Sequence, residues 1–299
     1  MILRTLIKRN IKLFFKDKGL FFTSLITPMI LLVLYATFLA NVYRDAFSSG
    51  FPVGFSISDE LLDATVGAQL MSSLLAVSCV TVSFCSNMLS VQDKVTGART
   101  DLTVSPVSRS TMAMSYYFAS FISTLCICLI ATAACFVYIA TIGWYYTVTD
   151  VLLIVGDVCL LVLFGTALSS LINIFLSTQG QLSAVGTIVS SIYGFICGAY
   201  MPMSQFSEGL RNVLMFLPGT YGTALIRNHT MNPAFRQMEE EGLPSEIITI
   251  HRDAVDANLY LFDKEISVGV MYAVTVGCIA LLIGAFILVH NLYGKKRTK

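Results

Sequence analysis

The stretch Val151–Phe175 decides the fold, because it reads VLLIVGDVCLLVLFGTALSSLINIF and holds a single charged residue, Asp157. A helix crosses the roughly 30 Å hydrocarbon core of a bilayer with about 20 predominantly apolar residues, and this stretch is long enough to do so. Its apolar residues do not alternate with polar ones, as they would in a strand of a membrane β-barrel. The stretch therefore predicts a transmembrane helix.

The rest of the chain has the same character. Hydrophobic residues make up 56% of the 299 residues and charged residues 12%, and the mean hydropathy is +0.75. A soluble domain has about 25% charged residues, and disordered segments are polar and charged, so both classes are excluded. We predict an all-α integral membrane protein that forms a single transmembrane domain over residues 1–299. Six spans are expected, at Gly19–Val42, Ala64–Leu89, Met112–Trp144, Val151–Phe175, Ala184–Met201 and Val268–Tyr293.

The distribution of Lys and Arg predicts how the chain lies in the membrane. With the N-terminus in the cytoplasm, 13 of the 19 basic residues fall on the cytoplasmic side, in agreement with the positive-inside rule. The six on the outer side are Arg44, Arg211, Arg227, Arg236, Arg252 and Lys264. We therefore expect a multi-pass protein of the cell membrane with both termini in the cytoplasm.

Residues 1–18 have the pattern of an amphipathic helix, in which the basic residues occupy one arc and the apolar residues the opposite arc. We predict a helix that lies flat on the inner membrane surface, with its basic side toward anionic headgroups or a soluble partner. The alternative is a positively charged topology signal with no other role. The basic residues are Arg4, Lys8, Arg9, Lys12 and Lys16.

The connection between the second and third spans, residues 91–110, is longer than a simple link between two packed helices needs to be. Connections between packed helices usually need two to eight residues, so the extra length indicates a role of its own. Gly97 breaks the segment, and Ser105-Pro106 forces an extended or turn geometry. We predict a short helix here, with Leu102 and Val104 as an exposed apolar contact for a groove on a soluble partner.

This connection also carries a family resemblance. Asp93 and Gly97, followed by Leu-x-x-Ser-Pro-Val-Ser-Arg over Leu102–Arg109, resemble the cytoplasmic coupling segment of the type-2 permeases of ATP-binding-cassette (ABC) exporters. The chain departs from the family pattern at Ala98, where Thr is usual.

A second group of residues, after the fifth span, is similar to the same family. Gly198-Ala-Tyr-Met-Pro202 resembles the exit of span five, and Pro218-Gly-Thr-Tyr221 with the later Arg227 resembles the re-entrant segment that follows. The loop over residues 228–265 is longer than the usual outer loop of the family.

The resemblance implies a permease that depends on another chain for its energy. No G-x-x-x-x-G-K-[ST] motif occurs in the sequence, so ATP and Mg²⁺ would be bound by a partner, a cytoplasmic P-loop ATPase. It also implies a second permease, either a copy or a paralogue. The coupling residues would be Asp93, Gly97, Arg99, Leu102, Ser105 and Pro106, and the outer gate would contain Gly198, Pro202, Pro218 and Tyr221.

The segment before the last span divides into two parts. Residues 202–227 predict two short apolar helices joined at Pro218-Gly219, which form a half-inserted hairpin that caps the outer mouth. Residues 228–265 hold three basic and eight acidic residues and predict an extracellular insertion with a solvated face.

Asp157 is the one acid well inside a predicted span, and an intramembrane carboxylate is a candidate functional site. The alternative is a carboxylate that reaches water or accepts a hydrogen bond from a neighbouring Ser, Thr or Tyr. Gly194 and Gly198 form a GxxxG motif, which allows close helix approach within one protomer or between two. The eight cysteines lie within predicted spans and the three histidines are scattered, so we expect no metal site and no catalytic group.

These patterns together indicate a permease subunit that exports a hydrophobic or amphipathic substrate across the cell membrane, driven by ATP hydrolysed on a separate subunit. The chain itself is expected to be neither an enzyme nor a cofactor protein, and to contact lipids rather than nucleic acid. The alternatives are an ion-coupled secondary transporter that uses Asp157 and a non-transporting membrane sensor or scaffold.

Overall fold

The computed structural model describes residues 2–49, 51, 57–104, 107–201, 203–262 and 264–296, and this part of the chain is almost entirely helical. The α-helices in the first half are α1 (Ile2–Lys16), α2 (Lys18–Leu34), α3 (Ala40–Ser49), α4 (Asp59–Asn87), α5 (Leu89–Val95), α6 (Ala98–Val104) and α7 (Arg109–Ile142). Those in the second half are α8 (Val148–Phe175), α9 (Gln179–Ile196), α10 (Glu208–Leu214), α11 (Pro218–Glu240), α12 (Ser245–Ala254) and α13 (Val268–Lys296). A π-helical segment, η1 (Tyr35–Leu39), follows α2, and a 3-10 turn, η2 (Met203–Gln205), precedes α10.

Five helices among the described residues are long and apolar enough to cross a membrane, so the chain is a multi-pass membrane protein. They cover Lys18–Asp45, Asp59–Val95, Arg109–Ile142, Val148–Phe175 and Val268–His290. The predicted fifth span, Ala184–Met201, is not among them. Its helix, α9, begins with the polar run Gln179-Gly-Gln181 and ends at Ile196, where the chain turns.

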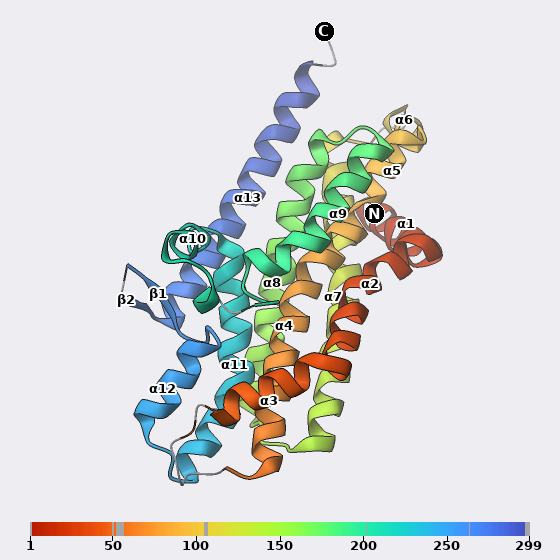
Figure 1. The fold of residues 1–299 in the computed structure, drawn as a ribbon. Helices are drawn as coiled ribbons and strands as arrows, with labels where there is room; N and C mark the ends of the chain where they lie inside the picture. Colours follow the sequence, from red (N-terminus) through yellow and green to blue (C-terminus); the bar gives the residue numbers. More distant parts are fainter. Residues whose placement is uncertain are drawn as a thin grey trace.

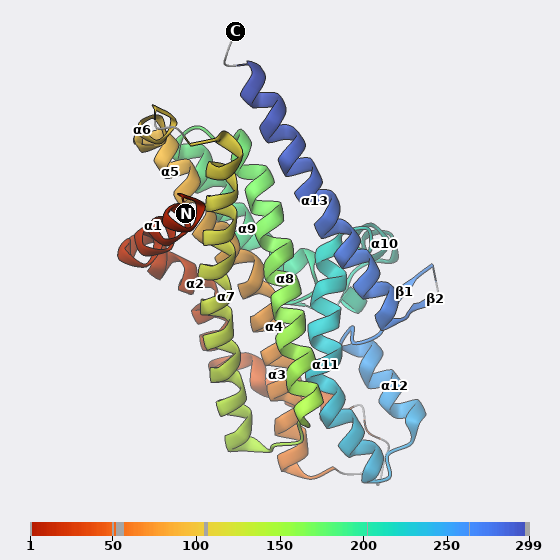
Figure 2. The ribbon, with the colours of Figure 1, turned by 180° about the vertical axis from the view of Figure 1, so that it is seen from behind.

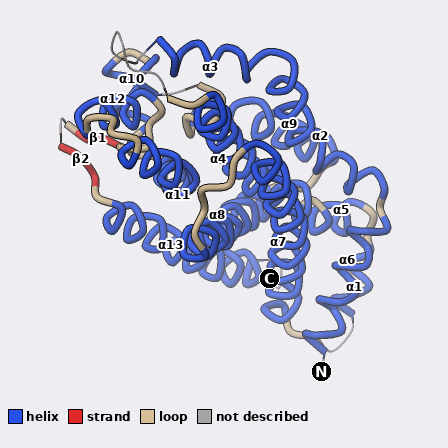
Figure 3. Tube along the Cα trace, turned by 90° about the horizontal axis from the view of Figure 1, so that it is seen from below, coloured by secondary structure: helices blue, strands red, loops and turns tan. Residues whose placement is uncertain are grey.

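The bundle is built around α4, which contacts α2, α7, α8, α9 and α11 (Figure 3). Small and hydroxylated residues on α4 allow neighbouring backbones to approach closely. A Cβ atom added to Gly165 of α8 would lie 2.9 Å from Ser83 Oγ and 3.0 Å from the carbonyl oxygen of Cys79. Ser83 Oγ itself donates to that Cys79 carbonyl, at 2.7 Å, so the buried hydroxyl is satisfied within α4.

The molecule has two ends, which Figures 1 and 2 show from opposite sides. The α6 end carries α1, α5, α6 and the C-terminal part of α13, and the α12 end carries α3, α12 and the last turns of α11. The predicted N-terminal helix is present as α1. Its apolar side packs against the protein's own helices, mainly α7, and Phe14 is 1% exposed.

For the predicted hairpin over residues 202–227, the expectation that its second helix is short is wrong. The break lies before Pro218, which sits in the first turn of α11, and that helix continues past residue 227 to Glu240. Most of α11 is buried against α4, α8 and α13, and its polar side chains find partners on α8 and on the segment after α12. A boundary at 227/228 therefore does not separate two structural units.

After α11 the chain folds back along the bundle. α12 leads to a short antiparallel hairpin of β1 (Leu259–Leu261) and β2 (Lys264–Ile266), in which Leu259 pairs with Ile266. Ile248 of α12 and Leu243 pack in one apolar cluster with Leu62 of α4 and Phe47 of α3. The segment predicted as a solvated insertion thus contributes apolar side chains to the core at the α12 end.

Candidate functional site

The predicted coupling segment forms two short helices, α5 and α6, at one end of the bundle (Figure 1). Gly97 lies between them with φ +83°, a left-handed conformation that side chains other than glycine rarely adopt. The predicted break at this glycine is confirmed, and it gives two helices where one was expected. Ser108 caps the next helix, α7, by accepting a hydrogen bond from the backbone N–H of Thr111 at 3.1 Å.

Asp93 joins α5 to two other helices. Its side chain is 9% exposed, and its Oδ2 accepts hydrogen bonds from Arg9 Nη1 of α1 at 2.7 Å and from the Tyr116 hydroxyl of α7 at 2.5 Å. Partial burial would lower the pKa of Arg9, but the hydrogen bond and charge of Asp93 raise it above its usual value. The guanidinium therefore stays charged, and α1, α5 and α7 meet at one ion pair.

Lys94, the next residue, joins α5 to the C-terminal end of α8. Its Nζ donates to the carbonyl oxygens of Asn173 at 2.6 Å, Leu176 at 3.1 Å and Ile174 at 3.2 Å. Asn173 and Ile174 lie in the last turn of α8 and Leu176 is its C-cap, where backbone acceptors lack helical partners and the helix dipole is negative. Sequence reasoning missed this residue, because nothing in its spacing points to a helix end 79 residues further along the chain.

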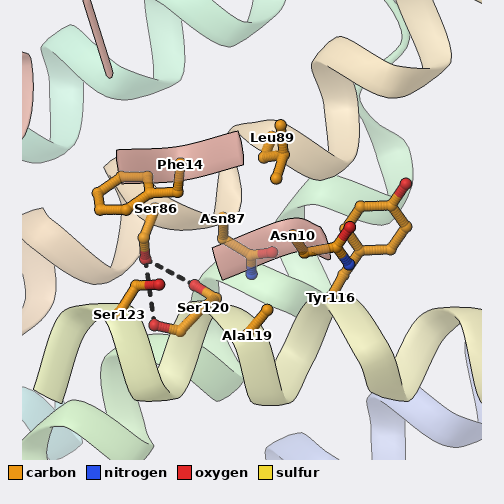
Figure 4. A pocket seen from close by; sticks show the side chains of 9 residues that line it. All are labelled: Asn10, Phe14, Ser86, Asn87, Leu89, Tyr116, Ala119, Ser120 and Ser123. Atoms are coloured by element: carbon orange, nitrogen blue, oxygen red, sulfur yellow. Dashed lines mark hydrogen bonds between the residues drawn. The ribbon is translucent and has the colours of Figure 1, made fainter. Parts of the chain in front are cut away.

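A layer of polar side chains lies beneath α5. Asn87 Nδ2 of α4 donates to Ser170 Oγ at 2.7 Å and Ser169 Oγ at 3.0 Å on α8, and Ser86 Oγ lies 2.7 Å from Ser120 Oγ on α7. Ser86, Asn87 and Ser120 border a cavity of about 10 Å³, which has room for one water molecule but for no substrate (Figure 4). The cavity is lined by Asn10, Phe14, Ser86, Asn87, Leu89, Tyr116, Ala119, Ser120 and Ser123.

The remaining predicted coupling residues do not all face outward. Arg99 is half-buried on α6. Leu102 is also half-buried, and it packs against a cluster that includes Phe14 and Leu89, so it is not the exposed contact that we predicted. Val104, two residues further along α6, is 85% exposed. Ser105 and Pro106 lie outside the described residues.

The predicted outer-gate residues lie along the path from α9 to α11. Gly198 adopts φ +74° at the exit of α9, and its carbonyl oxygen accepts a hydrogen bond from Arg227 Nη2 at 2.6 Å. Pro218 begins α11, and Tyr221, on the same helix, is buried in an apolar cluster with Met203 and Met271. Pro202 lies outside the described residues.

A buried ion pair connects this path to the segment after α12. Arg227 is 1% exposed, and its Nη1 lies 3.4 Å from Asp256 Oδ2, which also accepts the backbone N–H of Met203 at 2.5 Å. Asp256 has φ +57°, an uncommon conformation for a residue other than glycine. Sequence reasoning missed Asp256, because it lies among the acids of the predicted solvated insertion.

Asp157 lies inside the bundle with both carboxylate oxygens occupied. It is 1% exposed, Oδ2 lies 2.5 Å from His229 Nδ1 on α11, and Oδ1 accepts from the Tyr272 hydroxyl of α13 at 2.5 Å. The structure therefore agrees with the interpretation that a tyrosine satisfies this acid. The histidine partner was not foreseen, since the three histidines are far apart in the sequence.

The first glycine of the GxxxG motif packs against residues of its own chain. A Cβ atom added to Gly194 would lie 2.3 Å from the ring of Tyr200, which folds back over α9 after the turn at Gly198. The Gly194 carbonyl also accepts the backbone N–H groups of Ala199 and Tyr200, at 2.8 and 2.9 Å. The close approach that this glycine allows is therefore to its own chain.

These features define a multi-pass membrane protein with a polar, ion-paired element at one end. The model of the ABC-2 type transporter family matches residues 2–229, so the chain belongs to this family, the membrane permeases of type-2 ABC transporters. Members of the family are transmembrane subunits that work with ATP-binding subunits. The match ends at His229 within α11, so Asp256 and Tyr272 lie beyond it. None of the curated proteins compared with the chain matches it.

Proposed function

We propose that the chain is the permease subunit of an ABC exporter, which moves a hydrophobic or amphipathic substrate out across the cell membrane. A separate ATPase subunit binds ATP and Mg²⁺ and supplies the energy, and a second permease, a copy or a paralogue, completes the transporter. In this proposal the α6 end faces the cytoplasm, in keeping with the excess of Lys and Arg in the segments at that end.

The observation that carries the proposal is that α5 is held on two sides by adjacent charged residues. Asp93 ties it to α1 and α7, and Lys94 ties it to the end of α8. A displacement of α6 by a docked ATPase would pass through α5 to three helices of the bundle together. A connection that served only to join α4 to α7 would need neither the contacts of Asp93 nor those of Lys94.

The docking contact in this proposal is Val104. An exposed apolar side chain within a polar surface suits a groove on a soluble partner. Leu102 has a different role, because it packs against the cluster that contains Phe14 and Leu89 and so fixes α6 to the bundle.

The experiment is co-purification of the permease with its ATPase, identified from the neighbouring reading frame, followed by ATP hydrolysis in reconstituted membranes. Val104→Asp would place an unpaired charge in the groove, which weakens docking by several kcal/mol where the charge cannot reach water. We expect this variant to fold and to lose the ATPase. Val104→Thr is the matched control, since it keeps the shape without a charge, and it should retain the ATPase.

Retention of the ATPase by Val104→Asp, with wild-type hydrolysis, would contradict docking through α6. If no ATPase associates with the wild-type chain, the transporter proposal itself fails.

A further inference from the structure

We propose that the exposed cations of α1 and the start of α2 bind the headgroups of anionic phospholipids at the bilayer surface. The residues are Arg4, Lys8, Lys12, Lys16 and Lys18, which we call the basic stripe. This inference is independent of the transport function proposed above.

The first observation is that the basic stripe is free of internal partners. Its α1 members recur every four residues, so they follow one side of the helix, and all five side chains are exposed. Within the part of the chain that the structure describes, none of the five lies within ion-pair distance of a carboxylate. Arg9 differs from them, because it turns inward to Asp93. The stripe therefore presents unneutralised charge away from the protein.

The second observation is an aromatic corner where α1 meets α2. Ring centroids are 5.2 Å apart for Phe14 and Phe15, 5.9 Å for Phe15 and Phe21, and 5.6 Å for Phe21 and Phe22. Phe15 is 42% exposed and Phe22 is 62% exposed. Phe side chains on a helix that lies at the membrane surface insert at the boundary between headgroups and acyl chains. The corner thus marks the level at which the bilayer surface meets the chain.

The third observation is that the corner continues into a surface that faces lipid. Only 12% of the apolar window of the first candidate span is buried, and Ile26, Met29 and Ile30 of α2 are each more than half exposed. Lys18 lies on the same helix as these side chains, and Lys16 is the last residue of the helix before it. A bilayer that covers α2 therefore brings its headgroups against the stripe.

These observations favour a lipid over a protein as the occupant. Most of the apolar side of α1 packs against α7, so the helix offers a partner mainly charge, with Ile2 and Phe15 as its exposed large apolar side chains. A protein interface has an apolar core, whereas anionic headgroups need only cations near the surface. Val104 of α6 and Val95 of α5, which are also exposed apolar side chains at this end, lie on other elements.

The experiment compares two variants of the full chain in vesicles of phosphatidylcholine and phosphatidylglycerol. The neutral variant changes all five stripe residues to Gln. The charge-preserving variant, which is the matched control, carries Arg4→Lys and Lys→Arg at the other four positions. Spin-labelled phosphatidylglycerol and phosphatidylcholine report the relative association constants of the two lipids with the protein.

We expect the wild-type chain and the charge-preserving variant to prefer phosphatidylglycerol, and the neutral variant to lose this preference by about tenfold, because each cation near an anionic surface contributes to attraction. High salt should remove the wild-type preference as well, since exposed charges are screened. This salt test needs no variant and holds even if the neutral variant fails to fold. Three outcomes would overturn the proposal: no wild-type preference, a preference that survives in the neutral variant, or a neutral variant that loses only its ATPase.

Discussion

Asp157 is a buried acid that two different helices satisfy, through His229 on α11 and Tyr272 on α13. The change Asp157→Asn keeps an acceptor oxygen for the Tyr272 hydroxyl and offers an amide donor to His229 Nδ1, so both contacts survive without charge. We expect this variant to keep most of its transport, because in the proposed mechanism ATP supplies the energy and no proton needs to travel on the carboxylate. Asp157→Leu should instead leave His229 and Tyr272 buried and unpaired, at a cost of about 1–3 kcal/mol each.

Transport into vesicles with ATP and without a pH gradient, together with thermal unfolding, checks both variants. The ion-coupled alternative predicts a different result. If wild-type transport followed an imposed pH gradient without ATP and Asp157→Asn abolished it, the carboxylate would be the coupling group and the ABC proposal would fail.

At the α6 end, Lys94 is a second residue whose hydrogen bonds can be removed by substitution. The change Lys94→Met removes the three hydrogen bonds to the last turn of α8 but keeps an unbranched side chain of similar length. A cation near a helix C-terminus contributes up to about 2 kcal/mol in a partly buried place, so stability should fall by no more than that. The ATPase should still bind, because Val104 is unchanged, yet substrate-stimulated hydrolysis should be lost.

The measurement for Lys94→Met is stimulated against basal ATP hydrolysis, with Lys94→Arg as the control that retains a cation. Normal stimulation in Lys94→Met would show that this tie only holds the fold together.

At the scale of elements, a variant of α9 can show whether its GxxxG motif packs within the chain or between two protomers. The ring of Tyr200 fills the space above Gly194, so Gly194→Ala must displace it. Overpacking of this kind typically costs about 1–3 kcal/mol. Adding Tyr200→Ala should restore stability, because it empties the same space. Thermal unfolding of the single and double variants checks this. A Gly194→Ala variant of unchanged stability that dissociates a dimer would instead assign the glycine to an interface between protomers.

The elements also show how far the sequence predicts this structure. The break at Gly97 and five of the six spans follow from local rules of backbone conformation and apolar length. The burial of α11 along most of its length does not follow from local rules. A helix of mixed polarity can be buried only where residues distant in the sequence form hydrogen bonds with its polar side chains. Lys94, His229 and Asp256 were missed for the same reason, since each partner lies at least 29 residues away along the chain.

At the scale of the whole molecule, the two ends are held by separate polar networks. Asp93 and Lys94 lie at the α6 end, whereas Arg227 and Asp256 join the exit of α9 to the segment after α12. The two networks share no residue among those described, and α4 and α8 run between them. A change in one network should therefore leave the function of the other end intact.

The change Asp256→Leu tests this separation. It removes the carboxylate that faces the guanidinium of Arg227 and the backbone N–H of Met203, and breaking a buried pair in this way costs about 3–5 kcal/mol. We expect a clear loss of thermal stability and faster amide exchange in residues 241–262, because α12 loses its tie to α11. Arg227→Met with Asp256→Leu should recover part of the stability, since no charge is then left buried alone. Both variants should still co-purify with the ATPase, because α6 lies at the opposite end and keeps Val104 exposed. Loss of the ATPase at a temperature where the variant remains folded would show that the two ends act as one unit.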